Sequence, residues 1–248
     1  MNLELSGKIA LITGASSGIG AASARIFAEE GTDVIVSYGQ NVEGANRTLE
    51  AVKNHGRRAW LCQMDNGNPE SVSRAIAGLR RDVGGLDVLI LCAGHNIISP
   101  LPQITPDEWN AVINVNLNGP FYVLQACIPL LRDGASVVTV ASVAAQTGAP
   151  QHAHYAAAKA GLVNLTKSAA RALAPRVRVN CVAPGLTITP MGQDAIKALA
   201  PDYAQKKLLL QRYATSEEIA RCIAFVASPL TGFMTGATID INGGRELR

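Results

Sequence analysis

Long apolar runs, paired cysteines and a strong charge of either sign are all missing from this sequence of 248 residues. No apolar run approaches the ~18 residues of a membrane-spanning helix, and no N-terminal stretch joins a basic start to a long apolar core. We therefore expect a cytoplasmic location without secretion or membrane insertion. The five cysteines have no paired spacing, which favours reduced thiols and no metal site. The formal net charge of +3 is too small to indicate nucleic-acid binding.

Short apolar runs suited to buried strands alternate with helical patterns along the whole chain. The expected strands are residues 8–13, Asp33–Tyr38, Ala59–Met64, Leu86–Leu91, Ser136–Ala141, Val177–Val182 and Thr238–Ile241. This alternation predicts an α/β fold with a single doubly wound, Rossmann-type parallel sheet of about seven strands and helices on both faces. No linker or repeat marks a second domain, so residues 1–248 are expected to form one domain, with residues 186–212 as a substrate lid.

A glycine-rich segment follows the first expected strand and precedes a helix expected from about Ala21 to Glu30. Glycines at 14, 18 and 20 permit a tight turn, the close approach of a pyrophosphate, and close packing of helix on strand. The free N–H groups at the start of the helix would face the anion. A strand, a glycine turn and a helix in this order predict dinucleotide binding.

Tyr155 and Lys159 stand four residues apart in a helical stretch, so their side chains share one face of the helix. A fixed ammonium favours the phenolate and is expected to lower the pKa of Tyr155. The pair then acts as a general acid/base, with the hydroxyl of Ser142 holding a substrate oxygen. The alternative is a chance Tyr-x-x-x-Lys spacing on a solvated helix face.

These motifs, in this order, resemble the short-chain dehydrogenase/reductase family over nearly the whole chain, and most closely its 3-oxoacyl-acyl-carrier-protein reductases. The Thr-Gly-x-x-x-Gly-x-Gly turn, Asp65, Ala93-Gly94, Pro184-Gly185 with Thr189, and residues 236–244 carry the resemblance together with the catalytic motif. The family implies hydride transfer between nicotinamide and a carbonyl or secondary alcohol. The residues that it implies are the catalytic set Asn116, Ser142, Tyr155 and Lys159; the cofactor-binding set Gly14, Ser16, Ser17, Gly18, Ile19, Gly20, Ser37, Tyr38, Asp65, Asn66, Ala93, Gly94, Tyr155, Lys159, Pro184, Gly185, Thr187 and Thr189; and the substrate-binding set His95, Asn96, Ser142, Ala144 and Tyr155.

One departure from the family is the pair Leu91-Cys92, which replaces two asparagines before Ala93-Gly94. The first asparagine is thought to support the central strand, so other groups must meet that role here. We expect Cys92 to be a small buried hydrophobe and not a reactive thiol.

Asn116 precedes Pro120 by four residues in an expected helix that begins near Asp107. Proline has no N–H, so the carbonyl of Asn116 loses its usual partner and the helix should kink there. We hypothesise an ordered water that takes this carbonyl and links Asn116 to Lys159, as in the family's proposed proton relay. The alternative is a structural kink in which the carbonyl is bonded elsewhere.

Cofactor choice depends on residues 37–41 at the end of the second strand, where no acid occurs before Glu43. An acid there would bind the ribose 2′-hydroxyl of NAD, whereas neutral donors from Ser37, Gln40 and Asn41 can accept the 2′-phosphate of NADP. Ser17 stands where many NADP users carry Arg or Lys, and Arg47 is a distant candidate cation. NADP(H) is favoured over NAD(H).

The resemblance implies a ketoreductase of 3-oxoacyl-type substrates, with an alcohol, sugar or secondary-metabolite dehydrogenase as the alternative. A non-catalytic dinucleotide-binding sensor is the rival from another class, and the intact catalytic set argues against it. Acyl carrier protein is a possible partner, since Arg176 matches a docking position of carrier-protein reductases, although Asp133 with Arg132 beside it occupies the other. A homotetramer is expected through residues 107–131 and 152–174. His152 and His154 either line the cleft or are ordinary structural histidines.

Overall fold

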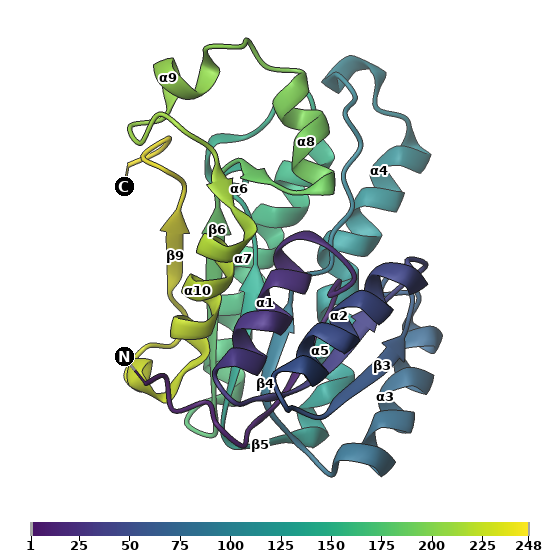
Figure 1. Ribbon diagram of the computed structural model, residues 1–248. Coiled ribbons are helices and arrows are strands. Elements are labelled where there is room, and N and C mark those ends of the chain that lie inside the picture. Colours follow the sequence, from purple (N-terminus) through teal and green to yellow (C-terminus); the bar gives the residue numbers. More distant parts are fainter. Residues whose placement is uncertain (1, 248) are drawn as a thin grey trace.

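A computed structural model of the protein describes residues 2–247, and a seven-stranded parallel sheet forms its centre (Figure 1). The strand order is β3-β2-β1-β4-β5-β6-β9, and each neighbouring pair is parallel. The strands are β1 (Ile9–Ile12), β2 (Asp33–Tyr38), β3 (Ala59–Gln63), β4 (Leu86–Leu91), β5 (Leu131–Val140), β6 (Val177–Pro184) and β9 (Thr238–Ile241). The predicted doubly wound α/β fold is therefore confirmed, and the strand order reverses between β1 and β4.

Two strand boundaries differ from the sequence prediction by more than one residue. β5 begins at Leu131, before the expected Ser136, because Leu131 already pairs with Leu86 of β4 although three exposed polar or glycine residues then interrupt the apolar pattern. The register with β4 shifts there, between Leu86 and Val88. β6 continues to Pro184, which pairs with Ile241 of the edge strand β9 and needs no N–H to do so.

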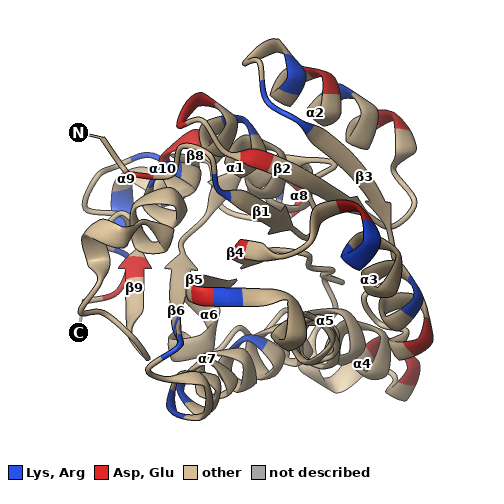
Figure 2. Cartoon of the chain, turned by 90° about the horizontal axis from the view of Figure 1, so that it is seen from below, with Lys and Arg blue, Asp and Glu red and all other residues tan. Residues whose placement is uncertain are grey.

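Helices cover both faces of the sheet, as Figure 2 shows from below. One face carries α1 (Gly18–Glu29), α2 (Val42–Asn54) and α10 (Ser216–Ala227), and the other carries α3 (Pro69–Val83), α5 (Gly119–Cys127) and α7 (Ala153–Leu173). Successive strand residues alternate between the two apolar cores, with Ala10 and Ile12 in one and Ile9 and Leu11 in the other. Charged residues of both signs lie mostly on the outer elements (Figure 2). Within residues 2–247, no helix combines the length and apolarity needed to cross a membrane.

Helix α1 begins at Gly18, earlier than the expected Ala21. Glycine disfavours a helix interior, but here it is required in the first turn, because a Cβ on Gly20 would lie 2.3 Å from the carbonyl oxygen of Gly14. The closely packed turn therefore overrides the helix propensity.

The helix expected to kink before Pro120 departs from α geometry at that place. α4 (Pro106–Ile113) passes into a π-helical turn, Asn114–Asn118, before α5 begins at Gly119. The N–H of Gly119 bonds to the carbonyl of Asn114, five residues earlier, as in a π-bulge. Pro120, in the first turn of α5, has no N–H to offer the carbonyl of Asn116, four residues earlier.

The segment that we expect to form the lid rises above the carboxyl ends of the strands (Figure 1). It contains β7 (Thr187–Ile188), α8 (Pro190–Lys197) and α9 (Tyr203–Lys207), and β7 pairs with β8 (Ala214–Thr215). The remaining short elements are η1 (Leu101–Gln103), η3 (Ile128–Leu130), α6 (Ala144–Thr147) and η4 (Pro229–Thr231).

Candidate active site

A cavity of about 1120 Å³ lies at the carboxyl ends of the parallel strands, below the lid segment. Every residue in the predicted cofactor-binding and substrate-binding sets lines it. Three of the four predicted catalytic residues, Ser142, Tyr155 and Lys159, also line it, whereas Asn116 does not. The topology therefore brings residues from positions 14 to 189 to one cleft, and their individual roles remain predictions.

The glycine turn between β1 and α1 has the geometry that a pyrophosphate needs. Gly14 adopts a φ of 67°, and a Cβ there would lie 2.8 Å from the Cα of Ala93 on the neighbouring strand end. Ser17 makes no side-chain cap, and within residues 2–247 the N–H groups of residues 18–20 have no hydrogen-bond acceptor. Free N–H groups at a helix N-terminus suit an anion, so this turn fits a dinucleotide.

The hydroxyl of Thr13 links the ends of β1 and β4 at the place where the family carries paired asparagines. It accepts hydrogen bonds from the N–H groups of Cys92 (2.9 Å) and Ala93 (3.0 Å) and donates to the carbonyl of Ile90 (3.3 Å). The end of β4 at Leu91-Cys92 is therefore supported by Thr13, which follows the neighbouring strand β1.

Tyr155 and Lys159 share one face of α7 at the edge of the cavity, as the spacing predicts. The Nζ of Lys159 lies 5.5 Å from the centroid of the Tyr155 ring. The same Nζ donates to the carbonyl of Val140 at 2.9 Å, and Lys159 is only 2% exposed. The carbonyl at the end of β5 thus holds the ammonium beneath the tyrosine.

The expected lowering of the Tyr155 pKa by the ammonium is wrong for the structure without cofactor. Burial raises the pKa of Tyr155 to about 12, and a hydrogen bond with Ser142 opposes this rise only in part. Burial also lowers the pKa of Lys159 to about 8. The loss of solvation on burial is the largest cause of both shifts, and the ammonium of Lys159 faces the carbonyl of Val140.

Asn116 lies buried behind the cavity wall, inside the π-helical turn. Its Nδ2 donates to the carbonyls of His95 (2.6 Å) and Val112 (2.8 Å), and its Oδ1 accepts from the N–H of His95 (3.3 Å). A Cβ on Gly94 would meet both the Oδ1 of Asn116 (3.0 Å) and the Nζ of Lys159 (3.8 Å). Asn116 therefore fixes the backbone beside Lys159, and the proton relay stays a hypothesis.

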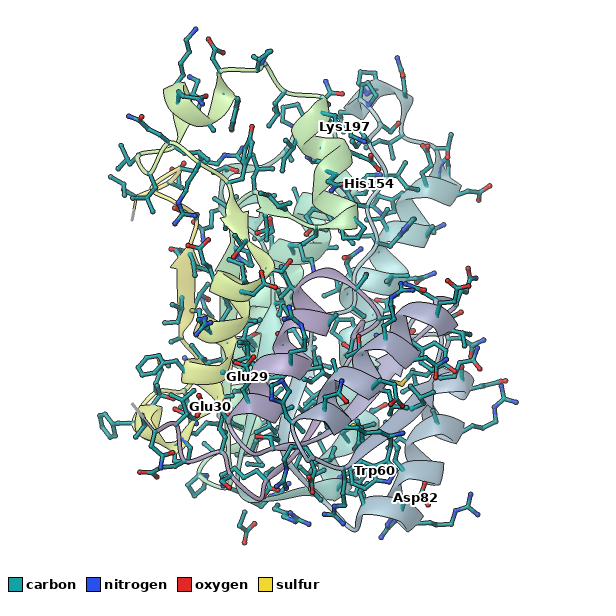
Figure 3. All side chains as sticks on the ribbon, in the orientation of Figure 1. Glu29, Glu30, Trp60, Asp82, His154 and Lys197 are labelled. Carbon is teal, nitrogen blue, oxygen red and sulfur yellow. The ribbon has the colours of Figure 1, made fainter. Side chains whose placement is uncertain are left out.

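The two histidines before Tyr155 occupy different places. His152 lines the cavity, and its ring stands edge-on to the Tyr155 ring at 6.3 Å. His154 is fully buried, and its Nδ1 accepts from the N–H of Tyr155 at 2.9 Å. Burial lowers the pKa of both histidines. In Figure 3, His154 and Lys197 of α8 lie in the upper part of the molecule. Glu29, Glu30, Trp60 and Asp82 lie in the lower part.

Two cations that the sequence did not predict also line the cavity: Arg74 on α3 and Arg245 after β9. Neither stands in a motif, and only the folded chain brings them to the cleft. The distant candidate Arg47 does not line the cavity, because its exposed side chain faces Glu43 at 3.8 Å. Among the lining residues, Asp65 is the one carboxylate. Within residues 2–247, no three His, Cys, Asp or Glu side chains are grouped to hold a metal ion.

Comparison with known proteins places these features in a family. Residues 14–246 match the family model described as enoyl-(acyl carrier protein) reductase. The chain is 38% identical over 241 residues to the 3-oxoacyl-[acyl-carrier-protein] reductase FabG of Staphylococcus aureus, which covers 96% of this chain and 97% of that protein.

Solved structures agree with the sequence comparison. A short-chain dehydrogenase/reductase from Brucella melitensis, described as a glucose/ribitol dehydrogenase, superposes with a TM-score of 0.94 at 33% identity over 100% of both chains. A short-chain dehydrogenase from Burkholderia cenocepacia in complex with NADP gives a TM-score of 0.91 at 35% identity, over 97% of this chain and 98% of that chain. The chain belongs to the short-chain dehydrogenase/reductase family, is most like its 3-oxoacyl-carrier-protein reductases, and is an oxidoreductase that acts on carbonyl or hydroxyl groups with a nicotinamide cofactor.

Proposed function

We propose that this protein is an NADP(H)-dependent ketoreductase of 3-oxoacyl-type thioesters. The observation that carries the proposal is the meeting of Ser142, Tyr155 and Lys159 in the same cavity as the glycine turn. The FabG relatives, which are named for reduction of 3-oxoacyl-carrier-protein, support this substrate class.

The side chains at the site are suited to managing a proton. A bound nicotinamide supplies or accepts the hydride. Tyr155, with a pKa of about 12, is protonated at neutral pH and holds the proton that a carbonyl oxygen needs on reduction. Ser142 bonds to Tyr155 and provides a second hydroxyl for that oxygen. The Nζ of Lys159, whose pKa is about 8, is held beside Tyr155 by its hydrogen bond to the carbonyl of Val140. From this position it can interact with an anion or a hydroxyl bound nearby.

The adenosine end of the cavity supports NADP(H). The buried hydroxyl of Ser37 is without a hydrogen-bond partner in residues 2–247, and it lines the cavity at the end of β2. Gln40 and Arg74 line the same cavity and offer further donors to a 2′-phosphate. Asn41 is less suited than we expected, because its Nδ2 already donates to the carbonyl of Ser16 at 3.4 Å while its Oδ1 caps α2 through Gly44. The NADP bound to the Burkholderia cenocepacia relative is consistent with this preference.

The two arginines considered for carrier-protein docking are engaged within the chain. Arg132 pairs with Asp87 at 2.7 Å, and Arg176 donates to the carbonyls of Leu131 and Ile128. Arg132 and Arg176 lie near the amino ends of β5 and β6, whereas the cavity lies at the carboxyl ends of the strands. We therefore place substrate recognition in the thioester and its acyl group, with a carrier as an optional bearer of that thioester.

We further propose that the protein is a homotetramer built through α4–α5 and α7. Trp109 on α4 and Phe121 on α5 are 40% and 43% exposed, and such aromatic side chains favour an interface. Sedimentation of the purified protein measures its mass directly, and a monomer at all concentrations contradicts this assembly.

The proposed activity is tested by screening purified protein against 3-oxoacyl thioesters of N-acetylcysteamine and coenzyme A, and against neutral ketones and polyols. Consumption of NADPH and NADH, and formation of either from alcohols, is followed by absorbance. The expected result is the highest kcat/KM for a thioester with NADPH. A higher kcat/KM for a polyol or a simple alcohol, or a preference for NADH, overturns the corresponding part of the proposal.

A further inference from the structure

Arg245 is an unpaired cation in the wall of the cavity. Within residues 2–247, its half-buried guanidinium has neither a hydrogen bond nor an ion pair, and the carboxylate of Glu246 forms no bridge to it. Most other arginines near the sheet have a partner; Arg178, for example, donates to the carbonyls of Ala227, Ser228 and Met234. A guanidinium that presents five donors to a cavity and has no protein partner suits an anionic ligand.

The backbone fixes the position of Arg245. β9 leads into a turn in which the Oδ1 of Asn242 accepts from the N–H of Gly244 at 2.9 Å, and the N–H of Arg245 bonds to the carbonyl of Asn242 at 3.2 Å. Gly243 and Gly244 adopt φ values of 66° and 76°, which glycine allows at little cost in strain. The side chain is therefore presented by a defined turn.

This turn also contacts the end of the lid segment. The N–H of Leu210 bonds to the carbonyl of Gly243 at 3.1 Å, and a Cβ on Gly244 would meet Leu209 atoms at 2.7 Å. Figure 1 shows the C-terminal end of the chain beside the segment that follows α9. Arg245 thus stands where the lid, the last strand and the cavity meet.

His152 connects Arg245 to the reacting centre. It lines the same cavity, its buried Nδ1 is without a partner in residues 2–247, and its ring is 6.3 Å from that of Tyr155. The charge of Arg245 acts on His152, together with burial and His154, to lower the His152 pKa. The carboxylate of Asp65 follows β3, two strands beyond β1, so it is remote from β9 in the sheet order. Among the described residues, no cavity-lining carboxylate therefore lies on β9, where Asp240 is outside the cavity lining and accepts a hydrogen bond from Gln146 at 2.6 Å.

We propose that Arg245 binds an anionic oxygen group of the substrate, a carboxylate or a phosphate, with His152 alongside. This inference rests on the proposed ketoreductase function and specifies its substrate class. A free 3-oxo acid provides the anion as a carboxylate two carbons from the ketone. A coenzyme A or carrier thioester provides it as a phosphate further along the arm. The guanidinium fork matches either group.

The test compares four 3-oxo substrates of equal chain length with the wild type and three variants. The free acid carries a carboxylate, the coenzyme A thioester carries phosphates, and the ethyl ester and N-acetylcysteamine thioester carry no charge. The variants are Arg245→Gln, Arg245→Lys and the control Arg80→Gln. Arg80 is an exposed arginine of α3 that does not line the cavity.

We expect Arg245→Gln to raise KM for the charged substrate about 10- to 100-fold with little change in kcat, and to leave the neutral substrates within about twofold. Arg245→Lys should recover part of the loss, and Arg80→Gln should match the wild type. A selective loss with the free acid identifies a carboxylate site, and one with coenzyme A thioester identifies a phosphate site. Equal losses with charged and neutral substrates, or no loss, overturn the role of Arg245.

A binding measurement separates this inference from the proposed function. The melting temperature of the protein, without cofactor, is measured against increasing acetoacetate and inorganic phosphate. Stabilisation in the wild type that is lost in Arg245→Gln supports the anion site even if no carbonyl substrate is turned over. Turnover of neutral 3-oxo thioesters, with no anion stabilisation and no preference for charged substrates, confirms the ketoreductase and refutes the anion site.

Discussion

The ammonium of Lys159 lies against the face of the Tyr155 ring, 5.5 Å from its centroid, while donating to the carbonyl of Val140 at 2.9 Å. One carbonyl at the end of β5 therefore sets where the only buried cation of α7 is held. The tyrosine is left with Ser142 as its hydrogen-bonding neighbour. The contact that positions the ammonium, between Lys159 and Val140, is thus separate from the contact of Tyr155, the proposed proton donor, with Ser142.

Replacing Tyr155 by Phe removes the phenolic proton and keeps the ring. Because general acid catalysis contributes about 10²- to 10⁴-fold, kcat for carbonyl reduction should fall by that factor. The dissociation constant for NADPH, measured by fluorescence titration, should change little. Near-full turnover in Tyr155→Phe contradicts the assignment of Tyr155 as the acid.

The pKa of Lys159 links the stability of the protein without cofactor to pH. Burial lowers this pKa from 10.5 to about 8, so between these values the unfolded chain binds a proton that the folded chain does not. The contribution of Lys159 to the free energy of unfolding should therefore rise by roughly 3 kcal/mol as the pH increases from about 8 to 10.5. Urea unfolding of the wild type and Lys159→Met across this range measures the difference.

In Lys159→Met this pH-dependent rise should be absent, so the two curves converge or cross as pH increases. Tyr155 acts in a separate window, because its pKa is raised from 10 to about 12 and its contribution is lost as pH rises through that range. Parallel stability curves of the wild type and Lys159→Met between pH 8 and 10 would show that the pKa of Lys159 is not lowered in the folded protein.

The cysteines should be unreactive although one of them lines the cavity. Burial raises the pKa of Cys92 and Cys62 to about 11, so almost no thiolate exists at neutral pH. Iodoacetamide at pH about 7.5 should leave Cys92 unmodified in the folded protein, while all five cysteines react after denaturation. Mass spectrometry of the digested protein provides the measurement. Rapid alkylation of Cys92 contradicts the prediction.

The preference for NADP(H) can be tested at Gly39, just after β2 in the cavity wall. A Cβ there meets only the carbonyl oxygen of Met64, at 4.0 Å, so a side chain fits. Gly39→Asp places a carboxylate near the adenosine ribose, and kcat/KM with NADPH should fall at least about tenfold more than with NADH. The neutral Gly39→Asn is the matched control. Equal effects of the two substitutions on both cofactors would refute a 2′-phosphate site here.

Local pattern and family resemblance predicted the sheet and the cleft because each strand is a continuous apolar run and each motif follows a strand. Thus Gly14 and Ala93, far apart in sequence, come within contact distance once β1 pairs beside β4. The position of Lys159 beside Tyr155 followed from helical spacing alone. Pro120 also predicted the place where the helix departs from α geometry, although not the π-helical form that the departure takes.

Other features depend on three-dimensional surroundings that the sequence does not encode locally. The raised pKa of Tyr155 arises from desolvation, which no i, i+4 rule includes. The roles of Thr13 in joining two strand ends and of Asn41 in capping α2 require the actual contacts. Arg74 and Arg245 reach the cavity only through the packing of α3 and the turn after β9.

The tight contact between Gly244 and Leu209 has a practical consequence for handling the protein. An affinity tag or fluorescent fusion attached after this turn would push on the covering segment and disturb measurements of substrate preference. The N-terminal end lies at the opposite end of the molecule from that segment (Figure 1). Purification handles therefore belong at the amino end.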